Sequence, residues 1–228
     1  MAEISIAAIV PVFNEVQLLP EKLVSLKALN VEELVIVDGG STDGTQQLLE
    51  KAGVCWLAGV KGRAAQMNAG AGQCKSDILL FIHIDTEMYE GDMSIIRSVM
   101  NQPDMVGGRF DVRLSGRHPA CRMISWFINA RSRLTKISTG DQALFVRRGI
   151  FERMGGFANL PLMEDIEFST RLKEEGGIAC LRQTVTTSSR RWQQHGIVST
   201  ILLMWKLRLF YWLGTPADKL AIMYRDAR

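Results

Sequence analysis

The sequence has little of what marks a secreted protein or a zinc-thiolate protein. Its 228 residues include only four cysteines, which lie far apart, with no Cys-x-x-Cys pair and no histidine pair nearby. Cys55, Cys74, Cys121 and Cys180 are therefore expected to be structural thiols, and neither disulfides nor zinc ligands. The first residues contain no basic segment followed by an apolar core and a small-residue cleavage site. We expect no secretory signal and a cytoplasmic location.

Long apolar runs free of charge are also absent. The most hydrophobic segment, residues 197–213, is interrupted by Lys206 and Arg208, and it falls short of the about 20 apolar residues that a transmembrane helix needs. We expect an apolar C-terminal helix here, either packed against the rest of the chain or lying at a membrane interface. No repeat, low-complexity tract or linker is visible. The length fits one domain over residues 1–228.

The charge of the chain is divided unevenly. Residues 1–108 contain 7 Lys and Arg against 14 Asp and Glu, a net charge of −7, whereas residues 109–228 contain 20 against 10, a net charge of +10. The basic half indicates an anionic partner, such as a phosphate-bearing substrate or a lipid surface. A solvated arginine-rich surface explains the same count equally well.

The clearest candidate site follows residues 78–82, five apolar residues that run directly into His83 and then Asp85. A continuous apolar run is typical of a strand that lies inside a parallel sheet and is covered by helices on both faces. Side chains two positions apart on a strand point the same way, so His83 and Asp85 are expected to face one cleft. In open α/β sheets, ligands bind at this carboxyl end.

Strand and helix patterns alternate along the rest of the chain, which predicts the α/β class. A strand over residues 4–12, a helix over 18–29 and a strand over 34–37 predict a parallel crossover, followed by a helix over 46–51. Further on, the patterns predict helices over 91–100, 121–136 and up to 175, and strands over 105–114, 143–147 and 179–187.

Six short motifs, in this order, resemble the family-two glycosyltransferases of the GT-A fold, and they cover nearly the whole chain. They are Pro11-Val-Phe-Asn-Glu15, Val37-Asp-Gly-Gly-Ser-Thr-Asp-Gly-Thr45, the segment from Arg63 to Asn68, His83-Ile-Asp85, Gly140-Asp-Gln142 and Glu164-Asp165. The chain is similar to small bacterial members with His-x-Asp in place of Asp-x-Asp. The resemblance implies a GT-A-type, Rossmann-like fold, with a mainly parallel central sheet flanked by helices and the apolar C-terminal helix.

The resemblance also implies roles for individual residues. Residues 1–108 would bind the nucleotide sugar and residues 109–228 the acceptor. Asp85 matches the metal-binding carboxylate, and Asp165 would be the catalytic base. The expected donor-binding residues are Pro11, Asn14, Glu15, Asp38, Arg63, Asn68 and His83. The expected acceptor-binding residues are Gly140, Asp141, Gln142, Glu164, Arg191 and Trp192.

Two positions depart from the family pattern. His83 stands where the first carboxylate is usual, and Gly39 stands where many members carry a second Asp after Asp38. Because Mg²⁺ prefers oxygen donors and Mn²⁺ tolerates imidazole better, His83 is expected to contact ribose or phosphate, with metal ligation left open. A turn-capping Asp38 and a solvated loop Arg63 are the structural alternatives to donor binding.

Helical periodicity distinguishes Asp165 from its neighbour Glu164. Asp165 shares a stripe with Phe168, Ser169 and Leu172, which is predicted to face the protein, whereas Glu164 shares one with Glu167 and Arg171, which is predicted to face water. The sequence therefore favours Asp165 as the general base. Favourable placement of both acids at a positive helix start is the structural alternative.

The function expected from this resemblance is transfer of a sugar, with inversion, from a nucleotide-diphosphate donor, expected to be UDP-linked, to an acceptor hydroxyl or phosphate. A divalent metal, Mn²⁺ or Mg²⁺, would carry the leaving diphosphate. An anionic membrane surface is a further expected partner, and nucleic acid is not. Two alternatives stay open: a catalytically inert nucleotide-sugar binding or membrane-scaffold protein, and a sugar-nucleotide nucleotidyltransferase, although residues 11–15 do not form its Gly-rich phosphate loop.

Overall fold

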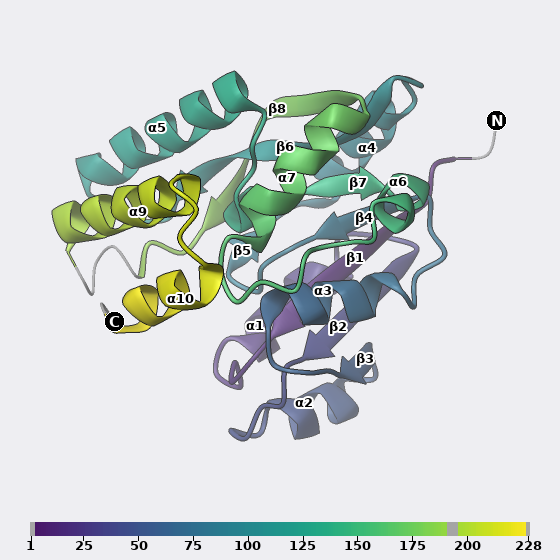
Figure 1. Cartoon of the computed structure of the whole chain (residues 1–228). Coiled ribbons are helices and arrows are strands. Elements are labelled where there is room, and N and C mark those ends of the chain that lie inside the picture. Colours follow the sequence, from purple (N-terminus) through teal and green to yellow (C-terminus); the bar gives the residue numbers. More distant parts are fainter. Residues whose placement is uncertain (1–2, 191–195, 227–228) are drawn as a thin grey trace.

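The structure, a computed structural model, describes residues 3–190 and 196–226. Its centre is one mixed sheet of eight strands, in the order β3-β2-β1-β4-β7-β6-β8-β5, with helices packed around it (Figure 1). The strands are β1 (Ile6–Val12), β2 (Glu33–Asp38), β3 (Cys55–Ala58), β4 (Ile78–Phe81), β5 (Thr86–Glu87), β6 (Met105–Leu114), β7 (Phe145–Arg147) and β8 (Gly177–Thr187).

The helices fall close to the expected positions and confirm the α/β class. They are α1 (Leu19–Lys27), α2 (Thr45–Ala52), α3 (Arg63–Ala71), α4 (Glu90–Met100), α5 (Pro119–Thr135), α6 (Arg148–Arg153), α7 (Glu164–Glu175), α9 (Ile197–Trp212) and α10 (Ala217–Asp226), with a 3-10 turn η1 (Gly140–Gln142). None of the helices within the described residues has the length and apolar character to cross a membrane.

The surroundings of β4 differ from those expected for the run at residues 78–85. β4 pairs in parallel with β1 on one side, but it pairs antiparallel with β7 on the other, so the prediction of a parallel sheet on both sides is wrong. The strand also ends at Phe81, before His83, because the chain turns there and the Thr86 N–H donates to the His83 carbonyl at 2.9 Å. An apolar run does not distinguish a parallel from an antiparallel neighbour.

Helices cover both faces of the sheet, as the unbroken apolar strands predict. Alternate residues of β1 belong to two separate cores, with Ala8 and Val10 facing α1 and α4, and Ile9 facing α3. β4 divides in the same way, since Leu80 lies in the first core and Leu79 in the second. The second core also contains the buried face of α7. This arrangement fixes the carboxyl ends of β1 and β4 between layers of helices.

Helix α3 lies close to the sheet because Gly70 has no side chain. A Cβ there would lie 2.6 Å from Cγ2 of Ile9 and 3.0 Å from Cγ2 of Val37. We expect Gly70→Ala to lower the free energy of unfolding by about 1–3 kcal/mol, because overpacking outweighs the better helix propensity of alanine. Urea unfolding measures this, with Gly72→Ala as control, since the nearest atom to a Cβ at Gly72 is 3.6 Å away. Equal stability of the two variants would contradict the close packing of α3.

The C-terminal helices complete the fold away from the β3 edge of the sheet, on the side of β6 and β8 (Figure 1). Figure 1 shows α5 and α9 side by side, with α10 next to α9. Ile197 and Ile201 of α9 pack against Cys121 and Ile124 of α5. Leu207 of α9 packs with residues of α10 and of the segment before α7. The apolar C-terminal helix is thus confirmed, and one side of it packs against the rest of the chain.

Candidate active site

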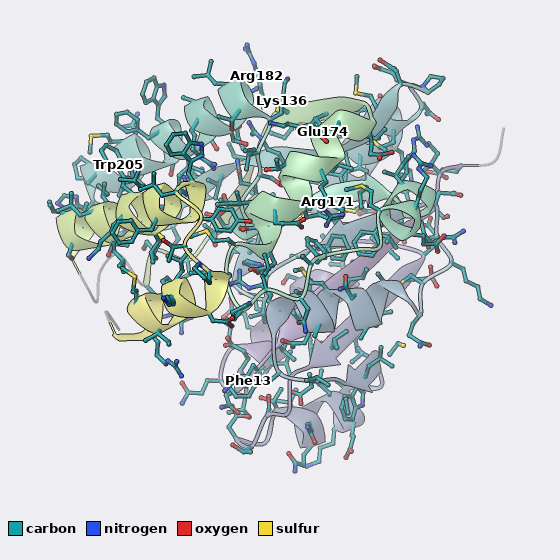
Figure 2. All side chains as sticks on the ribbon, viewed as in Figure 1. Phe13, Lys136, Arg171, Glu174, Arg182 and Trp205 are labelled. Atoms are coloured by element: carbon teal, nitrogen blue, oxygen red, sulfur yellow. The ribbon has the colours of Figure 1, made fainter. Side chains whose placement is uncertain are left out.

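A cavity of about 1400 Å³ opens where β1, β4, β6 and β8 end. Its walls come from the loops after these strands, the first turns of α3 and α7, and the inner sides of α5, α9 and α10. Phe13 and Trp205, both lining residues, lie well apart in Figure 2. A single small-ligand pocket has a volume of about 300–1000 Å³, so this cavity has room for more than one small ligand.

Nine of the fifteen residues predicted for the site line this cavity, and they come from both halves of the chain. Their side chains or backbone reach it from the loops after β1 and β4, from the start of α3, from η1 and from the start of α7. They are Pro11, Glu15, Arg63, His83, Asp85, Gly140, Asp141, Glu164 and Asp165.

Arg63, the first residue of α3, connects the two halves of the site. Its Nε lies 3.1 Å from Oε1 of Glu164, and its Nη1 lies 3.1 Å from Nε2 of His83. Gly140 packs against the same histidine so closely that a Cβ on it would lie 2.3 Å from Cε1 of His83. The glycine of the Gly140-Asp-Gln142 motif is therefore needed for this packing, and Arg63 is not a solvated loop residue.

Glu164 is 3% exposed, so the prediction that it faces water is wrong. Helix α7 begins at Glu164, directly after Met163, which has a left-handed backbone, φ 71°, and is itself buried against α9 and α10. The first turn of α7 is therefore covered by elements that the periodicity of α7 alone does not reveal. Burial raises the pKa of the Glu164 carboxyl, and the Arg63 charge opposes this rise.

Asp165 lies on the inward stripe as predicted, beside the buried Phe168, Ser169 and Leu172. One of its carboxylate oxygens accepts a hydrogen bond from the Gly140 N–H at 2.8 Å, and the other accepts from the Ile166 N–H at 2.8 Å. These bonds hold the carboxylate at the cavity wall. It is placed to accept a proton from a group bound in the cavity.

Three further carboxylates face the cavity: Glu15, Asp85 and Asp141. Burial, and then the charge of Asp141, raise the pKa of Asp85. Burial, and then the charge of Asp85, raise the pKa of Glu15. Oδ1 of Asp141 is buried with no hydrogen-bond partner among the described residues. These groups share a need for positive charge, which Arg63 and Arg190 supply only in part.

Asp85 and Asp141 fit a hard divalent cation. Both offer carboxylate oxygen, which Mg²⁺ and Mn²⁺ accept, and the unpartnered Oδ1 of Asp141 is free to ligate. Over residues 3–190 and 196–226, no three His, Cys, Asp or Glu side chains are grouped closely enough to hold a metal by themselves. Mg²⁺ in other proteins is usually held by only one or two carboxylates together with substrate phosphates.

Four predicted site residues are not among those that line the cavity, and each has a structural task. Asp38 is buried and accepts hydrogen bonds from the Gly40 N–H at 2.9 Å, from Gln46 Nε2 at 2.7 Å and from Ser41, so it caps its own turn. The other three are Asn14, whose Oδ1 accepts from Thr42 N–H; Asn68, which pairs with both backbone groups of Phe157; and the buried Gln142, whose Oε1 accepts from Thr139.

The remaining two predicted residues, Arg191 and Trp192, lie outside the described residues. Their assignment to the acceptor stays a prediction.

The structure adds three polar residues that the sequence reasoning did not single out. Gln66 bridges the ends of β1 and β2 by donating to the carbonyls of Val12 at 2.8 Å and Val37 at 2.7 Å. Arg131 of α5 and Arg208 of α9 line the cavity beside Asp141 and Asp165. Each of the two arginines interrupts an apolar stripe of its helix, and this was the only feature of the sequence that could have indicated a role in the site.

The chain matches a known protein family over the residues that form most of this site. Residues 7–157, more than half of the chain, match the model of glycosyl transferase family 2. The chain belongs to glycosyl transferase family 2. The matched residues extend from β1 through α6, and they contain most of the cavity-lining loops described above.

Solved structures support the fold of this family 2 chain. It superposes on TarS from S. aureus with a TM-score of 0.64 and 19% identity, covering 88% of this chain and 66% of that one. It superposes on the mannosyltransferase PcManGT from Pyrobaculum calidifontis with a TM-score of 0.67 and 19% identity, covering 91% and 61%. At this identity the likeness concerns the fold alone, and it confirms the GT-A-type architecture.

A curated relative resembles a shorter part of the family 2 chain. The undecaprenyl-phosphate 4-deoxy-4-formamido-L-arabinose transferase of Pseudomonas fluorescens is 34% identical over 36% of this chain and 28% of its own length. The chain spans less than two thirds of the length of each of these three proteins.

Proposed function

We propose that this family 2 chain transfers a sugar from a nucleotide-diphosphate donor to an acceptor, with inversion at the anomeric carbon. The observation that carries the proposal is the single cavity that gathers Asp85, Asp141, Arg63 and Asp165. The structural neighbours support a nucleotide-sugar donor, since TarS is described in complex with UDP-GlcNAc and the mannosyltransferase with GDP-Man and Mn²⁺. We expect a UDP-linked donor here.

On the donor side, the main barrier is the departure of a charged diphosphate. Arg63 is already positioned by Glu164 and His83, so its guanidinium can stabilise that charge without rearranging. Asp85 and Asp141 would hold Mn²⁺ or Mg²⁺, which supplies Lewis-acid stabilisation of the leaving diphosphate. His83 and Glu15 also line the cavity and would contact the donor.

On the acceptor side, Asp165 would take the proton of an attacking hydroxyl. The acceptor oxygen forms a bond to the anomeric carbon while the bond from that carbon to the diphosphate oxygen breaks on the opposite face, which inverts the configuration. The Gly140 N–H fixes the carboxylate of Asp165 for this step. If a phosphate oxygen attacks instead, Asp165 takes the proton of the phosphate monoanion, which is still partly present near pH 7 because the second pKa of a phosphate monoester is about 6.

A thermal-shift panel tests the proposed donor. Wild-type protein is mixed with UDP-, GDP- and ADP-sugars, with and without Mn²⁺, because a ligand that binds only the native state raises the melting temperature. We expect a UDP-sugar to raise it, and to do so more in the presence of Mn²⁺. A panel in which no nucleotide sugar raises the melting temperature would contradict donor binding.

The exposed side of α9 supports association with a membrane surface. Val198, Leu202, Leu209 and Trp212 are 69, 60, 53 and 81% exposed, and their spacing places them on one stripe of the helix. α5, beside α9, exposes Met123, Trp126 and Phe127. Soluble proteins seldom expose so many large apolar side chains together. Residues 109–228, which include both helices, carry a net charge of +10, and this charge suits an anionic lipid surface.

We expect the protein to bind vesicles that contain anionic phosphatidylglycerol, and to bind them less as salt rises, since screening acts over about 10 Å at 0.1 M. The double variant Trp126→Gln/Trp212→Gln should weaken binding in vesicle flotation, because it removes exposed aromatic anchors. Val24→Gln, which changes an exposed apolar residue on α1, serves as control. Absence of binding at low salt would assign the basic charge to a soluble phosphorylated substrate or to solvation.

A further inference from the structure

Arg131 and Arg208 are two cations in the cavity wall for which the proposed chemistry has no task. Nε and Nη2 of Arg131 are buried and make no hydrogen bond to any of the described residues. Neither arginine forms an ion pair with a carboxylate in the described part of the chain, although Asp141 and Asp165 lie near enough to influence both. Both arginines are half-buried, and buried polar atoms such as these two nitrogens of Arg131 nearly always have a partner in folded proteins.

The electrostatics agree with the geometry. Burial, and then the charge of Arg208, lower the pKa of Arg131 to about 10. Burial also lowers the pKa of Arg208, while Asp165 and Asp141 oppose that fall. The two guanidinium groups are thus close enough to repel each other. A bound anion would relieve both the repulsion and the missing hydrogen bonds.

Both arginines end an apolar stripe that lines the cavity. On α5 the stripe runs through Ile124 and Ile128 to Arg131, and on α9 it runs through Ile201 and Met204 to Arg208. In each helix the arginine follows the first isoleucine by seven residues, which is about 10 Å along the helix axis. The isoleucines of the two helices pack together. The cavity wall that α5 and α9 form is therefore apolar at one end and cationic at the other.

The orientation of α5 is fixed by contacts on its other side. Asn129 exchanges two hydrogen bonds with the backbone of Val112 in β6, at 2.9 and 3.0 Å. Arg133 donates to Asp111 at 2.5 Å and to the Cys180 carbonyl at 3.0 Å. These two residues hold α5 to the sheet and so place Arg131, which lies between them, in the cavity wall. The guanidinium of Arg131 is not needed to position the helix.

We propose that Arg131 and Arg208 bind the phosphate group of an amphiphilic acceptor, whose apolar chain lies in the cavity along the apolar stripes of α5 and α9. The proposal rests on the proposed function, because it assigns this end of the cavity to the acceptor of the glycosyl transfer. The phosphate then lies beside Asp165, and the chain leads along the helices that expose their apolar faces. Arginine suits this task because its planar group binds phosphate with two hydrogen bonds.

The test uses three probes below their aggregation concentrations: decyl phosphate, decanol and methyl phosphate. Calorimetry on the wild-type protein should give the tightest binding for decyl phosphate, because only that probe offers both the anion and the chain. Arg131→Gln and Arg208→Gln should each weaken the affinity for decyl phosphate by about tenfold or more, since a charge-assisted hydrogen bond is lost. Neither variant should change the affinity for decanol. Arg122→Gln, at an exposed arginine of the same helix, should change neither.

Two readouts separate this proposal from its alternatives. Arg131→Met should leave the melting temperature of the free protein unchanged or higher, whereas a lower value with unchanged decyl phosphate binding would make Arg131 a structural residue and overturn the proposal. Arg131→Gln could instead weaken UDP binding with Mn²⁺ and leave the affinity for decyl phosphate unchanged. That result would assign the arginines to the donor and would also overturn the proposal. Equal affinity for methyl phosphate and decyl phosphate would contradict the apolar chain.

The donor measurement keeps the two proposals distinguishable. If UDP does not bind but decyl phosphate binds through both arginines, the phosphate site stands and the proposed function fails. If UDP binds with Mn²⁺ and decyl phosphate does not bind, the proposed function stands and the acceptor proposal fails.

Discussion

Asp165→Asn is expected to lower turnover by about 10²–10⁴-fold, the usual effect of removing a general base. The affinity for UDP in the presence of Mn²⁺ should stay nearly unchanged. Asparagine has the same shape, and its amide oxygen can still accept the bond from Gly140. What the variant loses is the ionised oxygen that takes the proton of the acceptor. Initial rates of UDP release at saturating donor, together with calorimetry of UDP binding, measure the two effects.

Two variants on the same helix serve as controls. Glu164→Gln should disturb substrate binding more than turnover, since the Glu164 carboxylate positions Arg63 at 3.1 Å and does not take the acceptor proton. Glu174→Gln, at an exposed position of α7 labelled in Figure 2, should change neither rate nor affinity. Near-normal turnover of a folded Asp165→Asn protein would contradict the assignment and make Asp141 the next candidate base.

Asp85→Ala is expected to abolish the metal-dependent part of UDP binding. The proposed metal site has two carboxylates, and substrate phosphates would supply further ligands. The variant would leave only Asp141 to hold the metal. Titration of UDP by calorimetry, with Mn²⁺ and with a chelator, gives the metal-dependent difference directly. We expect that difference to vanish in the variant while the melting temperature does not fall, because burial beside Asp141 already disfavours the ionised form of Asp85.

The matched control for this variant is Asp104→Ala. Asp104 is exposed and does not line the cavity, so its removal should leave the response to Mn²⁺ intact. Unchanged UDP affinity with Mn²⁺ in Asp85→Ala would contradict the metal assignment and leave Asp85 with a structural task.

Much of the fold could be predicted from local pattern. Residues 105–114 were expected as a strand, and β6 has those bounds. The apolar strands β1 and β4 are covered on both faces because their side chains alternate between two cores, as an unbroken apolar run predicts. The direction of each strand in the sheet was harder to predict. β7 runs antiparallel to both its neighbours, and nothing in the sequence of residues 145–147 indicates this. Edge strand β3 and the short helix α6 were missed because neither has a long periodic pattern.

The candidate site was partly predictable for the same physical reason. Residues at the carboxyl ends of strands, such as Glu15 and Asp85, reach the cavity because neighbouring strands end at one edge of the sheet. Asp38 also follows a strand, but its carboxylate is used within its own turn. Glu164 was placed wrongly because α9 and α10, which cover the start of α7, return from far along the chain. Arg131 and Arg208 meet only in the folded protein.

The most direct test of glycosyl transfer is UDP release by the wild-type protein from a UDP-sugar with Mn²⁺, compared with release by the Asp165→Asn variant. We expect slow metal-dependent hydrolysis by the wild type without acceptor, with release of UDP and free sugar, and a much slower rate for the variant. A protein that binds the nucleotide sugar but never releases UDP would be an inert binding protein. Release of sugar phosphate together with UTP, when pyrophosphate is supplied, would show a nucleotidyltransferase. Either result would contradict glycosyl transfer.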